Sequence, residues 1–96
     1  MTVTHIVLLR WATDDDTVKD ELRAAVQGLA DKIDEIDSLT EGPSTSPEGL
    51  EAGFEYGFVI AFASHEARDV YLDHPAHLPV AALIQRWSAQ VLVFDI

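Results

Sequence analysis

One short segment carries most of the side chains in this chain that could take part in chemistry. Residues 71–77 read Tyr-Leu-Asp-His-Pro-Ala-His, so Tyr71 lies one helical turn before His74, and His77 follows three residues later. The proline between the two histidines restricts the backbone and holds both imidazoles in a constrained turn. Such a turn can place a neutral imidazole to accept a proton while a phenol hydrogen-bonds a developing oxyanion. This segment is therefore the first candidate for acid–base chemistry.

The same spacing also allows a purely structural interpretation. His74 would then cap a helix, His77 would hydrogen-bond the loop backbone, and Tyr71 would pack in the core. A metal site is a weaker alternative, because two neighbouring histidines need a third ligand, from His5 or a carboxylate. No glycine loop for phosphates and no dinucleotide fingerprint is present. We therefore expect neither a metal nor another cofactor.

A further histidine lies within an apolar strand. Residues 3–11 read VTHIVLLRW, which is dense in β-forming residues and bounded by polar ones, so they predict a strand. Alternation places His5 on the same face as Val7 and Leu9. His5 is then either a hydrogen-bonded core residue or a neutral base that a ligand can reach.

The first half of the chain predicts a strand, a long helix and an irregular edge strand. Asp16 or Thr17 is expected to be the N-cap, and apolar residues at spacings of three and four continue to Ile36. They predict one helix of about five turns. Residues 38–50 contain two glycines and two prolines and predict a short edge strand that runs into a loop.

The second half predicts a strand, a helix in two parts and a last strand. Residues 54–62 alternate, with one face formed by Phe54, Tyr56, Phe58, Ile60 and Phe62. Ser64 is expected to cap a helix that ends near Asp73, since the residue before Pro75 avoids helical geometry. Pro79 is expected to begin the next helix. Residues 90–96 are expected to form the last strand. The order β-α-β-β-α-β predicts an α+β, ferredoxin-like single domain over residues 1–96.

Composition and charge exclude several classes of protein. The chain has 6 Lys and Arg against 17 Asp and Glu, a formal charge of -11, and no cysteine. We expect no nucleic-acid partner and no membrane surface as partner, because both attract a surplus of basic residues. The absence of cysteine excludes disulfides and makes the cytoplasm the default location.

The first and last strands are apolar on both faces. Ile6 and Leu8 lie opposite the face of His5, and Leu92 and Phe94 lie opposite Val91 and Val93. One face can pack under the helices, but the other would leave an apolar patch in water, which soluble monomers seldom tolerate. The pattern predicts a homodimer packed sheet to sheet. An interior between or within the subunits could then hold a ligand, although a dry dimer core explains the pattern equally well.

Four stretches together resemble the stress-responsive A/B-barrel (Dabb) family. They are HIVLLRW, EGLEAGFEYGFVIAF, SHEARDVYLDHPAH and VLVFDI, and the resemblance runs nearly from end to end. It implies a ferredoxin-like subunit that pairs into a dimeric α+β barrel, in agreement with the pattern of the strands.

The resemblance also implies roles for individual residues. A polyketide cyclase of that family works without cofactor or metal, and its catalytic tyrosine and histidine match Tyr71 and His77. Its first-strand pocket histidine matches His5, while Tyr56 stands where it has another pocket histidine. The expected ligand-contacting residues are His5, Val7, Leu9, Tyr56, Phe58 and His74.

Together these features predict a cofactor-independent acid–base enzyme of cyclase, isomerase or lyase type. Its ligand would be a small apolar carbonyl or polyketide-like compound. The alternative is a non-catalytic, stress-responsive binding or structural dimer, which predicts no cavity large enough for a ligand. A third alternative, a cofactor-free monooxygenase or a haem-degrading enzyme, follows only from the shared barrel architecture.

Overall fold

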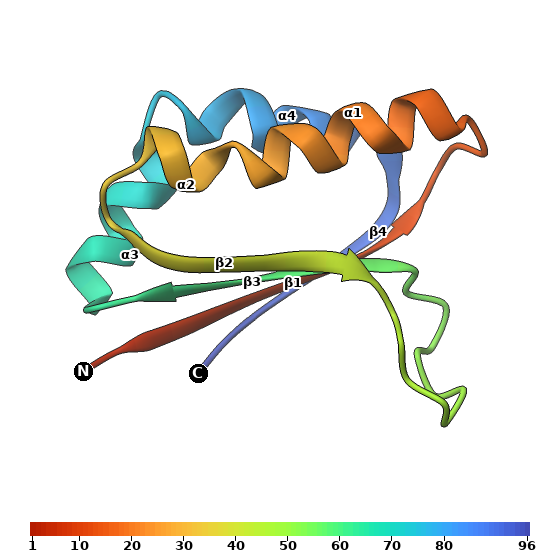
Figure 1. Ribbon diagram of the computed structural model, residues 1–96, viewed down its shortest axis with the longest axis horizontal. Coiled ribbons are helices and arrows are strands. Elements are labelled where there is room, and N and C mark those ends of the chain that lie inside the picture. The colour runs from red at the N-terminus through yellow and green to blue at the C-terminus, as the bar shows by residue number, and fades with distance from the viewer.

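Four strands form one antiparallel sheet, and all the helices lie on one of its faces (Figure 1). The computed structural model describes residues 1–96. In the order β2-β3-β1-β4, the strands are β1 (Val3–Trp11), β2 (Ile36–Pro43), β3 (Tyr56–Phe62) and β4 (Ser88–Asp95). The helices are α1 (Asp16–Gln27), α2 (Leu29–Lys32), α3 (His65–Asp73) and α4 (His77–Trp87). This arrangement confirms the predicted ferredoxin-like α+β fold.

The first helical region is shorter than predicted. α1 ends at Gln27, and Gly28, a poor helix former, separates it from the four residues of α2. Ile33 is already extended, and Ile36 opens β2, so the prediction of one helix to Ile36 is wrong. The spacing misled because both isoleucines still reach the core, with 0% and 9% exposure. The N-cap is one residue earlier than predicted, at Asp15.

The later helices and strands agree with the prediction, except that some of them begin at a different residue. Ser64 caps α3 by accepting the N–H of Ala67 at 3.0 Å, and α3 ends at Asp73 as predicted. α4 begins at His77 rather than at Pro79, which is tolerated because N–H groups in the first turn lack helical partners. β3 begins at Tyr56 rather than at residue 54, and β4 starts directly after α4.

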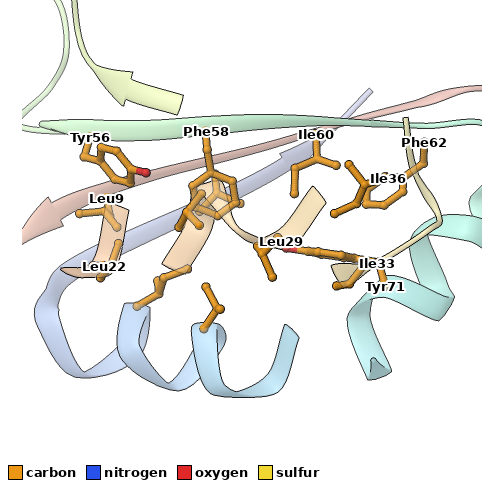
Figure 2. Packing of buried hydrophobic residues seen from close by; sticks show 14 of the residues in the cluster. Leu9, Leu22, Leu29, Ile33, Ile36, Tyr56, Phe58, Ile60, Phe62 and Tyr71 are labelled. Carbon is orange, nitrogen blue, oxygen red and sulfur yellow. The ribbon is translucent and has the colours of Figure 1, made fainter. Parts of the chain in front are cut away.

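The core lies between the sheet and the helices (Figure 2). Every second residue of β3 points into it, and Phe62 packs on Tyr71 of α3 with 5.1 Å between ring centroids. His5 is the one polar residue among the buried ones, with 4% exposure. The predicted faces of β1 and β3 are therefore confirmed, and His5 lies in the wall of the core.

The other face of the sheet is apolar and carries no helix (Figure 1). Ile6 pairs with Val59 and Phe94, and Leu8 pairs with Leu92, so these side chains share this outer face. Phe94 is 59% exposed. The segment between β2 and β3 extends on the same side (Figure 1). None of the helices combines the length and apolar composition of a bilayer-spanning segment.

An ion pair joins α1 to β2, and its contribution to stability should depend on pH. The Arg23 guanidinium donates to both carboxylate oxygens of Glu41, at 3.0 and 3.2 Å, and Gln27 donates at 2.7 Å. These hydrogen bonds, with that from Arg23 the strongest, outweigh burial and lower the pKa of Glu41 from 4.5 to about 2. A lowered folded-state pKa stabilises the protein above pH 4.5, and this contribution is lost as the pH falls toward 2.

Glu41→Gln is therefore expected to lower the free energy of unfolding by about 1 kcal/mol at neutral pH. This small value reflects the 37% exposure of the Arg23 side chain. Below pH 4.5 the difference from wild type should shrink, which thermal unfolding at a series of pH values would measure. Glu48→Gln removes an exposed loop carboxylate and is the control. Equal pH dependence of both variants would contradict the assignment.

Candidate active site

A pocket of about 360 Å³ lies between the sheet and helices α3 and α4. This volume is within the range of small-molecule sites in proteins. Its walls are mostly apolar, and its lining residues are His5, Val7, Phe58, Tyr71, Leu72, His77, Ala81, Ile84, Gln85, Val91 and Val93. The side chains from β4 and Gln85 are exposed, so the pocket opens between α4 and β4.

Three of the predicted site residues, His5, Tyr71 and His77, place neighbouring rings in the lining of the pocket. The ring of Tyr71 packs near both imidazoles, with centroid distances of 5.7 Å to His5 and 4.2 Å to His77. Tyr71 is 1% exposed. Burial raises the pKa of its phenol above the ordinary value, so Tyr71 stays protonated at neutral pH and can donate a hydrogen bond.

His77 is held in the form of a neutral base. Its Nδ1 lies 3.0 Å from the carbonyl oxygen of Leu72. A carbonyl only accepts hydrogen bonds, so Nδ1 carries the proton and Nε2 keeps its lone pair. Burial lowers the pKa of His77, with His5 and His74 adding to the effect, against the opposing hydrogen bond to Leu72. The first residue of α4 thus supplies an imidazole that can accept a proton near pH 7.

His5 is part of a chain of polar side chains that was not predicted. Its Nδ1 lies 2.6 Å from Oδ1 of Asp95, and Oδ2 of Asp95 accepts a hydrogen bond from Nη1 of Arg68 at 3.0 Å. Burial acts to raise the pKa of Asp95, but the contacts with His5 and Arg68 outweigh it and lower this pKa. Antiparallel pairing of β1 with β4 puts Asp95 opposite His5, and the register of that pairing could not be read from the strand pattern alone.

The remaining predicted residues lie away from this pocket. Leu9 is fully buried in the core, and Tyr56 pairs with it at the far end of β3, stacked on Trp11 at 5.4 Å. Figure 2 shows Tyr56 and Tyr71 at opposite ends of the packed side chains. Nδ1 of His74 accepts the N–H of Ala76 at 3.0 Å, which turns this ring toward the loop backbone. The pocket brings together His5, Val7, Phe58, Tyr71 and His77.

The alternation along β3 predicted correctly which residues point inward. It does not predict which of these inward residues lie next to the pocket. Tyr56 lies two residues from Phe58, or about 7 Å along an extended strand, which is enough to leave the pocket. No group of three or more His, Asp or Glu side chains has a geometry that could hold a metal ion. The sheet separates the pocket from the outer face, and one chain supplies all of the lining residues named above.

The fold and the pocket define the class of protein: a ferredoxin-like α+β domain with a tyrosine and histidines in one apolar pocket. Comparison with known proteins then identifies its family. The chain belongs to the stress responsive A/B barrel domain (Dabb) family, whose model matches residues 3–96. It is 28% identical over 96 residues to the stress-response A/B barrel domain-containing protein HS1 of Arabidopsis thaliana, covering 97% of this chain and 86% of that protein. Olivetolic acid cyclase of Cannabis sativa is 23% identical over 96 residues, covering 99% of this chain and 95% of the cyclase.

Solved structures share the fold over nearly the whole chain. Hydroxynitrile lyase from Passiflora edulis superposes with a TM-score of 0.91 at 20% identity, covering 99% of this chain and 91% of the lyase. A dimeric ferredoxin-like protein of unknown function from Thermobifida fusca gives 0.85 at 26% identity, covering 100% and 90%. A similar dimeric protein from Jannaschia sp. CCS1 gives 0.89 at 24% identity, covering 100% and 98%. Structural neighbours of this chain are thus dimeric ferredoxin-like proteins.

Proposed function

We propose that this protein is a cofactor-independent acid–base enzyme of cyclase, isomerase or lyase type, acting on a small, largely apolar carbonyl compound. One observation carries the proposal. The free Nε2 of His77 and the phenol of Tyr71 belong to rings 4.2 Å apart in an apolar pocket of about 360 Å³. A cyclase and a hydroxynitrile lyase among the similar proteins support this class of chemistry.

In the proposed reaction His77 is the general base and Tyr71 the hydrogen-bond donor. Nε2 of His77 takes a proton from the carbon beside a carbonyl group, or from a hydroxyl group. Tyr71 hydrogen-bonds the oxygen on which negative charge develops, a carbon–carbon bond forms or breaks, and the proton returns from His77 to the product. Positioned proton transfer of this kind is worth about 10²–10⁴-fold in rate. Val7 and Phe58 exclude water, which strengthens these hydrogen bonds.

The chain is further proposed to act as a homodimer that buries the outer face of the sheet. Ile6, Leu8, Leu92 and Phe94 form an apolar strip on that face, with Val59 beside it. Soluble proteins rarely leave such a strip in water, and a second copy covers it at no cost to the core. The dimeric neighbours support this assembly.

The function is tested with simple compounds that need the proposed steps. The wild-type protein is incubated with 4-phenylbutan-2-one in deuterated water, to follow exchange beside the carbonyl group, and with mandelonitrile, to follow its cleavage to benzaldehyde. We expect rates above the buffer rate for at least one compound. Ala81→Phe fills the pocket and should abolish them, whereas Ala82→Phe, on the exposed side of α4, should not.

The alternative, a binding or structural dimer, makes a different prediction for the same assays. It predicts buffer rates for wild type and both variants across a wider panel of apolar ketones and cyanohydrins. Catalysis that Ala81→Phe leaves unchanged would also contradict the proposal, because the reaction would then occur outside this pocket.

A further inference from the structure

A chain of charged side chains connects His5 to the protein surface behind the pocket. Arg68 comes from α3, Asp95 from the end of β4 and His5 from β1, so the chain joins three elements. The guanidinium of Arg68 also donates to the exposed carboxylate of Asp69 at 3.1 Å. The reaction proposed above assigns no role to Asp95 or Arg68.

We propose that Asp95 is a positioning residue, which fixes the imidazole of His5 so that an unprotonated Nε2 faces the pocket, while Arg68 holds Asp95 in place. The effect of Asp95 on catalysis rests on the proposed function, whereas its contacts with His5 and Arg68 do not depend on that function. Both oxygens of Asp95 are engaged, one by each neighbour, at 2.6 Å from His5 and 3.0 Å from Arg68.

The tautomer of His5 follows from its partner. An ionised carboxylate has no hydrogen to donate, so Nδ1 of His5 carries the proton that the pair shares. A neutral imidazole has one N–H, so in that form Nε2 is the ring nitrogen free to accept a hydrogen bond. The ring itself is held edge-on between Phe62 and Tyr71, at 6.2 and 5.7 Å, and is 4% exposed. Around the ring are Asp95 from β4, Tyr71 from α3 and His77 from α4, and Arg68 of α3 contacts the far oxygen of Asp95.

This arrangement narrows the class of ligand. In this arrangement the pocket offers two acceptor nitrogens, Nε2 of His5 and Nε2 of His77, whose rings both lie near that of Tyr71. Its lining contains no Lys or Arg to pair with a carboxylate. The ligand that fits is an uncharged carbonyl compound with a hydroxyl or enol group, which donates to His5 while His77 accepts the reacting proton.

Nuclear magnetic resonance tests the position of His5 without any substrate. Long-range proton–nitrogen correlation spectra distinguish protonated from unprotonated ring nitrogens, with the 4 histidines assigned by single replacements. We expect wild-type His5 to carry its proton on Nδ1. Asp95→Asn, whose amide can donate as well as accept, should shift His5 toward the Nε2–H form, and Asp95→Glu should restore the Nδ1–H form. Asp69→Asn, which changes another partner of Arg68, should leave His5 unaltered.

Kinetics test the consequence. With a compound that the wild type turns over, Asp95→Asn should lower kcat by about 10- to 100-fold and change KM less, and Asp69→Asn should match wild type. A wild-type His5 protonated on Nε2, or His5 signals that Asp95→Asn leaves unchanged, would overturn the proposal even if kcat falls. If no compound is turned over, the proposed function fails, and the spectra still decide the role of Asp95.

Discussion

His77→Ala is expected to lower kcat for any substrate of this protein by about 10²–10⁴-fold. The loss follows because Nε2 of His77 is the pocket's neutral base, oriented by the bond from Nδ1 to the Leu72 carbonyl oxygen at 3.0 Å. Steady-state kinetics measure the effect. The matched control is His65→Ala, since His65 is the exposed first residue of α3 as His77 is the first residue of α4.

The pH dependence of the wild type gives an independent check on His77. Burial lowers its pKa below the ordinary value of 6.5. The reactive form is the deprotonated one, so kcat should be constant at neutral pH and should fall only at a pH below 6.5. A kcat that His77→Ala leaves intact in a folded protein, or an acidic limb centred above 6.5, would reject His77 as the base.

Phe94→Glu is expected to convert a dimer into monomers. Phe94 pairs with Ile6 within the outer face and is 59% exposed in the single chain. A two-fold interface contains each residue twice, so the substitution buries two carboxylates without partners, at a cost of about 2–5 kcal/mol or more. Light scattering should give about twice 10.6 kDa for wild type and 10.6 kDa for the variant.

Val70→Glu is the control for this substitution. Val70 is an apolar residue of α3 with 50% exposure, and it lies on the helical side of the molecule. The Val70→Glu variant should therefore have the same mass in light scattering as the wild type. A wild-type mass of 10.6 kDa at micromolar concentration, or a dimer that persists in Phe94→Glu, would show that the outer face does not join two copies.

The strand faces could be predicted from the sequence because alternation needs no knowledge of the rest of the molecule. It placed His5 and Val7 on one face of β1 and Phe58 on the matching face of β3, and all three line the pocket. The end of α3 could also be predicted from neighbouring residues alone, because Pro75 disfavours helical geometry in the residue before it.

Features that depend on register or on distance along an element could not be predicted in this way. The pairing of Asp95 with His5 depends on how β4 aligns with β1, and that alignment depends on where α4 ends. Tyr56 has the predicted face but lies beyond the reach of the pocket. Ile36 fits a helical spacing of three and four, yet it packs equally well from the first residue of a strand.

The position of the sheet between the pocket and the outer face determines how two copies would work together. In the proposed dimer the two reaction chambers would lie on the far sides of the paired sheets, each walled by its own helices. Neither copy would lend a side chain to the other's chemistry. Occupation of one chamber should not alter the affinity of the second, so saturation should be hyperbolic, with a Hill coefficient of about 1.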